Sequence, residues 1–355
     1  MVPEHNGYSY AKDQPMGFKN RIQHVAIVGA TGNLGKFVTS ELLKTAGHKI
    51  TALTRLGSKS KLPEGIKQVP VDYDDEDSLV DVLQGQQFLI IILAVNTPPG
   101  VHSRIVKAAG KAKVPYIMPN SYGGDIVKGA PKDDFLPVYS KKDLQEIEDT
   151  GSSWIVMVCN LWYEYSLAMG PTWFGFDFAQ RKLTLYDDGN TKFNVTTWEQ
   201  CGRAIAGLVC LKVFPKNESD ADPTVSGFCN KPLYISSFLI SQNGMFKSWK
   251  RATGDKDEDW SVGQEDSKER FNRGIAMMKN QDPRTVRIGV GMASFVRMFF
   301  PGGDDNCESK HQLHNDSLGL PKGLLDERTT FAKKLVDEGY AAKLFRRAAE
   351  GINHE

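Results

Sequence analysis

Three glycines near the start of the chain form the clearest chemical motif in the sequence. Gly29, Gly32 and Gly35 lie in the run GATGNLG, directly after an apolar run at residues 24–28. A diphosphate approaching the N-terminus of a helix needs a tight turn and backbone free of side chains, so that amide N–H groups and the helix dipole face the anion. An ordinary glycine-rich turn is the alternative, but a position between an expected strand and an expected helix favours a dinucleotide-binding loop. We expect the dinucleotide to contact Gly29, Thr31, Gly32, Asn33, Leu34 and Gly35.

The residues after the second expected strand indicate which dinucleotide binds. The glycine spacing is GxxGxxG, whereas the dehydrogenase fingerprint GxGxxG is followed, about twenty positions on, by an acidic residue that binds the ribose 2′-hydroxyl. Here the strand ends in Thr54 and Arg55, with Lys59 and Lys61 just beyond. A guanidinium suits the 2′-phosphate of NADP, although a charged residue leaving a strand is often only solvated. We therefore expect the cofactor to be NADP(H) rather than NAD(H).

Alternating strands and helices position this loop. Strands are expected at residues 24–28, 48–54, 69–71, 88–94, 115–118 and 153–159, and helices at residues 35–44, 75–84, 101–113 and 141–150. Residues 88–94 are apolar without alternation, which is typical of a central parallel strand covered on both faces. The pattern predicts an α/β protein with a Rossmann-type, doubly wound parallel sheet.

The chain divides into a short tail and two expected domains. Residues 1–20 form the tail, residues 21–160 the NADP-binding domain, and residues 161–355 a smaller, mixed α+β substrate domain that ends in a helical segment at 325–349. A strand at 193–196 and a helix at 198–212 are expected to return, as the segment 193–212, to the first domain.

Charge and hydropathy exclude several classes of protein. Forty-four Lys and Arg residues oppose 43 Asp and Glu residues, which gives a net charge of +1. Binding to nucleic acid is favoured when clustered Lys and Arg residues displace counterions from the phosphates, and an anionic membrane attracts similar clusters. A neutral chain without a basic block has neither source of affinity. The longest strongly apolar run, residues 88–95, is too short to span a bilayer. We expect neither nucleic-acid binding nor stable membrane association.

The cysteines and histidines indicate neither a disulfide framework nor a metal site. The five cysteines are odd in number, widely spaced and not grouped as CxxC, which favours a reducing compartment. Because the N-terminus is polar and lacks an apolar signal core, we expect a cytoplasmic protein. Cys307, His311 and His314 have the spacing C-x3-H-x2-H, but no fourth ligand lies nearby, so we expect no metal.

The sequence around these motifs resembles a known family. The run at residues 24–55 is similar to the start of the atypical short-chain dehydrogenases of the NmrA-like and isoflavone reductase-like group, which includes phenylcoumaran benzylic ether reductases. Matching segments follow in order at residues 72–73, 94–96, 119–123 and 160–162, so that the resemblance covers residues 22–210. Within the group the chain most resembles the fungal oxidoreductase branch. The resemblance implies NADPH-dependent reduction, with Asn96 and Asn120 near the nicotinamide half of the cofactor.

The resemblance also implies a catalytic lysine. In these reductases a lysine early in the helix before the sixth strand acts as general acid/base, and matching Leu144 to the family's apolar position puts Lys141 there. Lys142 is the alternative, because the register is uncertain by one residue. Proton transfer near neutral pH requires burial or a nearby positive charge to lower the lysine pKa from about 10.4. Without the resemblance, the residues alone favour two solvated lysines on an exposed first turn.

Aromatic residues are concentrated just after the sixth expected strand. Seven of the 17 residues from 162 to 178 are aromatic, against 10% of the whole chain. Rings at this strand end would line an apolar pocket for a flat substrate, with Trp162 and Tyr163 closest to the hydride path. Packing of the second domain onto the first is the alternative and accounts for most of these rings.

Together these features predict an NADPH-dependent reductase of a small apolar metabolite, aromatic or polyketide-like in character. Hydride would leave C4 of the nicotinamide, and Lys141 would manage the proton. The alternatives are an NmrA-type regulator that senses NAD(P) without catalysis, and a non-redox isomerase or cyclase on the same scaffold, since fold alone does not decide between them. The substrate, the direction of hydride transfer and the oligomeric state stay open.

Overall fold

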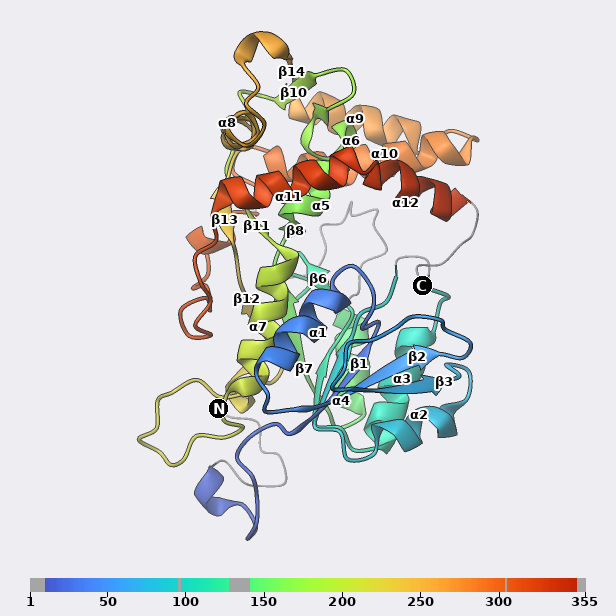
Figure 1. Cartoon of the computed structure of the whole chain (residues 1–355), viewed down its shortest axis with the longest axis vertical. Coiled ribbons are helices and arrows are strands. Elements are labelled where there is room, and N and C mark those ends of the chain that lie inside the picture. The colour runs from blue at the N-terminus through green and yellow to red at the C-terminus, as the bar shows by residue number, and fades with distance from the viewer. Residues whose placement is uncertain (1–9, 95–96, 128–140, 304, 350–355) are drawn as a thin grey trace.

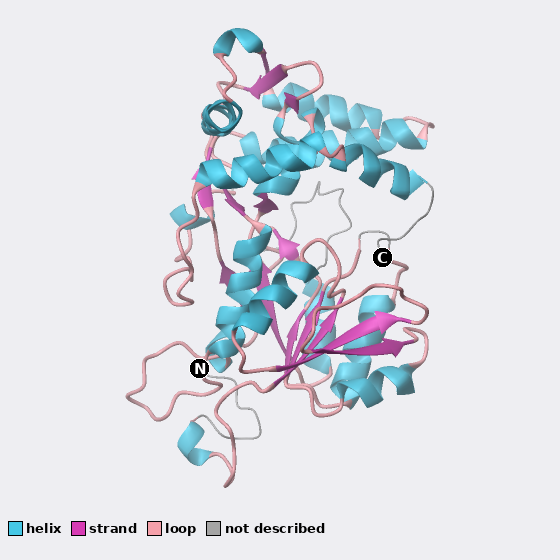
Figure 2. Ribbon diagram, in the orientation of Figure 1, coloured by secondary structure: helices cyan, strands magenta, loops and turns pink. Residues whose placement is uncertain are grey.

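A parallel sheet with helices on both faces forms the first part of the molecule (Figures 1 and 2). The computed structural model describes residues 10–94, 97–127, 141–303 and 305–349. The strands of this sheet are β1 (His24–Val28), β2 (Lys49–Arg55), β3 (Ile66–Val71), β4 (Phe88–Ile91), β5 (Tyr116–Met118), β6 (Tyr122–Gly123), β7 (Ser153–Val158) and β12 (Lys231–Tyr234). Their order is β12-β7-β5-β4-β1-β2-β3, with β6 paired to β7, and every pairing is parallel. The predicted Rossmann-type sheet is therefore confirmed.

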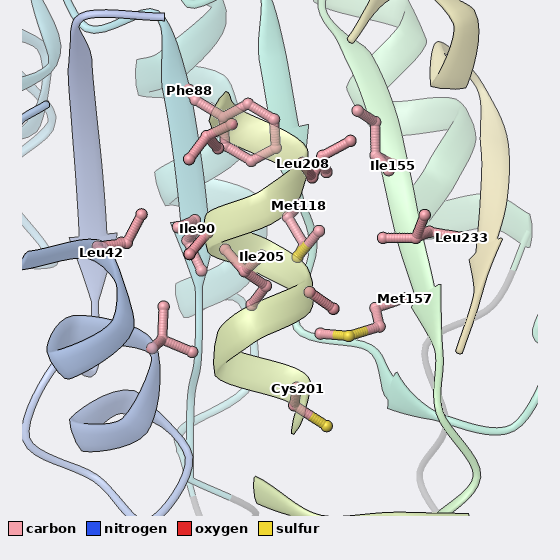
Figure 3. Close-up of a cluster of buried hydrophobic side chains, with 14 of the residues drawn as sticks. Leu42, Phe88, Ile90, Met118, Ile155, Met157, Cys201, Ile205, Leu208 and Leu233 are labelled. Carbon is pink, nitrogen blue, oxygen red and sulfur yellow. The ribbon is translucent and has the colours of Figure 1, made fainter. Parts of the chain in front are cut away.

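Helices cover the two faces of the sheet and enclose two separate cores. One face carries α1 (Gly35–Lys44) and α7 (Trp198–Cys210), and the other carries α2 (Glu76–Leu83), α3 (Val101–Lys111) and α4 (Lys141–Asp149). Strand side chains alternate between the faces, so Ile27 and Ile90 belong to the first core whereas Val28 and Ile91 belong to the second. Figure 3 shows α7 lying among the buried side chains of the sheet.

A second, smaller layer lies above this sheet domain in Figure 1. Its two sheets consist of β8 (Leu161–Trp162), β11 (Phe193–Thr196) and β13 (Phe238–Ile240), and of β9 (Phe176–Asp177), β10 (Lys182–Tyr186) and β14 (Ser261–Glu265). Its helices are α5 (Tyr163–Ala168), α6 (Pro171–Phe174), α8 (Gln242–Thr253), α9 (Ser267–Met277), α10 (Pro283–Val296), α11 (Leu325–Asp337) and α12 (Tyr340–Ala349). Short 3-10 helices are η1 (Ala11–Asp13), η2 (Ser226–Phe228), η3 (Asp257–Asp259), η4 (Arg297–Phe299) and η5 (Cys307–Ser309). This layer has a third core that is rich in aromatic rings.

The structure differs from the sequence-based expectations in a few elements. The strand expected at 88–94 ends at Ile91, and the helical segment expected at 325–349 is broken into α11 and α12 around Gly339, whose φ is +63°. β12 lies in a segment assigned to the second domain, yet it pairs with β7 in the first sheet. α7 packs against α1, whereas β11 pairs with β8 and β13 outside the large sheet.

No helix in the described part of the chain is long and apolar enough to cross a membrane. Groups of three or more His, Cys, Asp or Glu side chains placed to hold a metal ion are likewise absent from the described residues. Their five cysteines are all free thiols.

The close packing of α1 against α7 depends on Gly202. A Cβ at this position would lie 2.7 Å from the carbonyl oxygen of Phe37 and 2.8 Å from its carbonyl carbon. Both are backbone atoms of α1, so neither can move aside as a flexible side chain would.

Gly202→Ala should therefore lower the free energy of unfolding by about 1–3 kcal/mol, the usual cost of overpacking. Urea unfolding measures the change. Gly263→Ala in β14 is the control, because a Cβ there meets no atom of the described residues within 4 Å, and it should change stability by less than about 0.5 kcal/mol. Equal stability of the two variants would contradict this account of the helix contact.

Candidate functional site

The glycine loop connects β1 to α1 at the carboxyl edge of the sheet, where the strand order reverses between β1 and β4. Gly29 has φ +81°, and a Cβ on it would lie 1.9 Å from the carbonyl oxygen of Ile92. A Cβ on Gly35 would lie 2.0 Å from the carbonyl oxygen of Gly29. The packing of the protein itself therefore requires glycine at both positions.

Gly32 differs from the other two glycines of the loop. Among the described residues, a Cβ there would meet only the carbonyl oxygen of Gly29, at an ordinary contact distance of 3.4 Å. The turn is closed by hydrogen bonds from the Gly32 N–H to the Gly29 carbonyl and from the Lys36 N–H to the Gly32 carbonyl, both 3.1 Å. Because no other atom of the described residues lies within 4 Å of this position, the Gly32 backbone can be approached closely by a diphosphate, and the loop fits a dinucleotide cofactor.

The other predicted loop residues have different environments. Leu34 is 1% exposed and belongs to the first core, so only its backbone can face a ligand. Thr31 and Asn33 are half-buried. The Asn33 side-chain amide donates a hydrogen bond of 2.5 Å to the hydroxyl of Tyr340 in α12.

Asn120 lies close to the same edge of the sheet. Its side-chain oxygen accepts a hydrogen bond of 2.8 Å from the backbone N–H of Leu93, so it connects the chain after β5 to the chain after β4. The carbonyl oxygen of Ile92 on that same segment lies against Gly29. Asn96 lies outside the described residues.

Arg55 is the last residue of β2 and is exposed. It lies near the Tyr73 hydroxyl, whose pKa burial raises to about 12 although the positive charge of Arg55 opposes the rise. Arg104 of α3 donates from Nε to the Tyr73 carbonyl at 2.8 Å and pairs with Asp74 at 2.7 Å. Two guanidinium groups thus lie near Tyr73, beside the end of β2.

Lys141 and Lys142 are the first two residues of α4, and both side chains are exposed. The residues immediately before them, 128–140, lie outside the described part of the chain. Burial therefore does not distinguish the two lysines, and the choice of Lys141 stays a prediction.

Aromatic rings gather beside the glycine loop. Trp162 is half-buried, and its ring centroid lies 6.0 Å from that of Trp198 and 5.9 Å from that of Tyr165. Tyr165 in turn contacts Tyr340 at 6.1 Å. On the side of α1, the Lys36 ammonium lies 5.9 Å above the Trp198 ring. We call Trp162, Tyr165, Trp198 and Tyr340 the aromatic cluster.

The structure separates the two predicted pocket residues. Trp162 belongs to the aromatic cluster, whereas Tyr163 is fully buried in the core of the second layer. The Tyr163 hydroxyl is hydrogen-bonded to Thr329 at 2.7 Å, and its ring packs edge-on against Phe238. Burial raises the pKa of Tyr163 well above its usual range. Tyr163 therefore packs the second layer in this conformation and presents no surface to a ligand.

Sequence reasoning missed Glu164, a fully buried carboxyl next to the aromatic cluster. Its Oε1 accepts a hydrogen bond of 3.0 Å from the Trp198 N–H at the start of α7. Its Oε2 has no hydrogen-bond partner among the described residues. Burial raises the pKa of Glu164 to about 7, against the lowering effects of the hydrogen bond from Trp198 and the charge of Arg328. The one feature of the sequence that could have indicated Glu164 is its place as an acidic residue between aromatic neighbours.

Ionised Glu164 should destabilise the folded protein. In the unfolded chain this carboxyl titrates near its ordinary pKa of 4.5, and in the folded protein near 7. The energetic penalty is absent below the lower pKa, grows as the pH rises between the two values, and is complete above the higher one. At 1.36 kcal/mol per pKa unit, it amounts to roughly 3 kcal/mol.

Glu164→Gln should remove this penalty, because the amide oxygen still accepts from Trp198 and carries no charge. Measured by urea unfolding, the variant should gain up to roughly 3 kcal/mol over the wild type between pH 5 and pH 8. Glu258→Gln, at an exposed ion pair with Lys256, is the control and should show no such trend. A stability difference that is independent of pH would refute the buried titration.

Comparison with known proteins agrees with this architecture. The model of the NmrA-like family matches residues 21–165, from just before β1 into α5. Oxidoreductase aprR of Aspergillus flavus is 27% identical over 310 residues, which cover 85% of this chain and 96% of that protein. The resemblance inferred from the sequence is confirmed: residues 21–165 match the NmrA-like family model, and a fungal oxidoreductase is similar to most of the chain.

Two solved structures share the fold over most of this chain. The structure of AtPrR2 with NADP+ and (+)pinoresinol superposes with a TM-score of 0.66 at 18% identity, covering 89% of this chain and all of that one. A crystal structure of isoflavone reductase has a TM-score of 0.63 at 16% identity, covering 87% of this chain and 98% of that one. At these identities the likeness shows the shared fold.

Proposed function

We propose that this chain, whose residues 21–165 are NmrA-like, is an NADPH-dependent reductase of a small apolar metabolite, aromatic or polyketide-like in character. The observation that carries the proposal is the glycine loop, in which packing requires two glycines and the described residues leave the third, Gly32, uncovered. The name of the related oxidoreductase aprR and the NADP+ in the AtPrR2 structure support it.

The loop would hold the diphosphate through backbone N–H groups of residues 29–35, and Arg55 would pair with the 2′-phosphate of the adenosine half. Asn96 and Asn120 would lie beside the nicotinamide half. When bound, NADPH supplies a hydride from C4 of the nicotinamide to an electrophilic carbon of the substrate. The neighbouring carbon or oxygen then gains a negative charge that a proton must neutralise.

Lys141 would deliver that proton, directly or through a water molecule. Hydride and proton together amount to a two-electron reduction, so the step leaves neutral product and oxidised cofactor. The aromatic cluster would supply apolar contact for a flat substrate, with Trp162 as the predicted contact residue. Positioning of the reactants, rather than covalent catalysis, would supply most of the acceleration.

Arg55→Ala tests the preference for NADPH. Loss of a charge-assisted hydrogen bond costs about 1.5–3 kcal/mol, so the dissociation constant for NADPH should rise roughly ten- to a hundredfold while that for NADH changes little. Fluorescence titration with both nucleotides measures this. Lys67→Ala, which removes an exposed charge from β3, is the control. An unchanged affinity for NADPH in Arg55→Ala would refute the 2′-phosphate assignment.

Lys141→Ala and Lys142→Ala form a matched pair, because both residues are exposed on the first turn of α4. Turnover can be followed as NADPH absorbance loss with a panel of aromatic ketones, quinones and benzylic ethers. Lys141→Ala should lose at least about a hundredfold in kcat, the lower range for a general acid, and keep its affinity for NADPH. Lys142→Ala should stay near wild type.

The reverse result would shift the catalytic position by one residue to Lys142. Full turnover in both variants would show that neither lysine is the general acid. NADPH binding without turnover of any substrate class would favour an NmrA-type sensor or a non-redox enzyme over the proposed reductase.

A further inference from the structure

The C-terminal helix α12 contacts the glycine loop. Tyr340, its first residue, accepts a hydrogen bond of 2.5 Å from the side-chain amide of Asn33, although the two residues are 307 positions apart. In Figure 1, α11 and α12 lie above the sheet domain on the side of the second layer. The bond therefore links the second layer directly to the proposed nucleotide site.

The position of Tyr340 is fixed by more than this bond. Its ring lies edge-on to Tyr165, at 6.1 Å and 82°, and to Trp198, at 6.4 Å and 65°. Trp198 also stacks on Phe37 of α1, at 5.8 Å. Rings from α5 and α7 thus hold the tyrosine where its hydroxyl meets the loop, and the Phe37 ring of α1 supports Trp198.

The hydrogen bond to Tyr340 can influence the glycine loop through the Asn33 side chain. Asn33 directly follows Gly32, the glycine that the described residues leave uncovered, and it is half-buried. A primary amide has two N–H groups and an acceptor oxygen, and the Tyr340 bond engages one N–H group. An amide held in one orientation loses less conformational entropy when a ligand binds, which increases affinity.

We propose that Tyr340 is a positioning residue of the dinucleotide site, and that α12 forms part of that site by holding Asn33 against the diphosphate position. This inference rests on the proposed function, because it takes the ligand of the glycine loop to be NADP(H). It adds a residue from the far end of the chain to a site otherwise built from residues 29–120.

Tyr340→Phe tests the proposal, since it removes the hydroxyl and keeps the ring in the aromatic cluster. Calorimetric titration of the full-length protein with NADPH should show a dissociation constant about three- to tenfold higher than that of the wild type, as expected for one lost hydrogen bond. The melting temperature without nucleotide should stay close to that of the wild type. The NADPH-induced rise in melting temperature should be smaller.

Asn33→Ala and the double variant with Tyr340→Phe show whether the two side chains act together. The double variant should bind NADPH no more weakly than Asn33→Ala alone, because Tyr340 acts through Asn33. Tyr186→Phe is the matched control. It removes one buried tyrosine hydroxyl of the second layer, which donates to the Pro171 carbonyl at 3.1 Å, and it should leave the NADPH affinity unchanged.

Three results would overturn the proposal. Wild-type affinity in Tyr340→Phe would show that the bond has no part in binding, and tighter binding would show that Tyr340 competes with the nucleotide. Additive losses in the double variant would show that Tyr340 does not act through Asn33. Failure of the wild type to bind any nicotinamide nucleotide would instead overturn the proposed function, and this inference with it.

Discussion

The turn from β1 into α1 is the constraint on which the rest of the site depends. The carbonyl oxygen of Ile92 and that of Gly29 occupy the space where side chains at positions 29 and 35 would lie, so backbone packs directly on backbone. This close packing brings the chain after β4 against the loop and starts α1 directly behind it. The sheet then places Arg55 at the end of β2 on one side of the turn and Asn120 after β5 on the other.

The second layer meets this turn through aromatic rings and one buried carboxyl. Trp198 begins α7, which packs on the sheet, and the Trp198 ring also contacts Trp162, Tyr165 and Tyr340 of the second layer. The Glu164 side chain holds the backbone N–H of Trp198 and so fixes the start of that helix. The pair of Glu164 and Trp198 therefore connects the second layer to a helix that packs on the sheet.

Local sequence patterns predicted the parts of the fold that depend on local chemistry. The apolar run at 24–28 and the glycines after it predicted β1 and the loop, because strand burial and turn geometry are set by neighbouring residues. The helix break at Gly339 could also have been predicted, since glycine commonly ends a helix by adopting the positive φ that Gly339 has in the structure. β12 could not, because its short sequence KPLY is a strand only through its pairing with β7. Contacts such as Asn33 with Tyr340 leave no trace in spacing or periodicity.

The most direct test of this account is calorimetric titration of the wild type and of Gly32→Ala with NADPH. A Cβ at position 32 has room among the described residues but would occupy the face proposed for the diphosphate. The account predicts that the wild type binds NADPH, and that Gly32→Ala melts at the same temperature yet binds at least about tenfold more weakly, a loss of 1.4 kcal/mol or more. Equal binding by the two proteins, or no binding by the wild type, would contradict it.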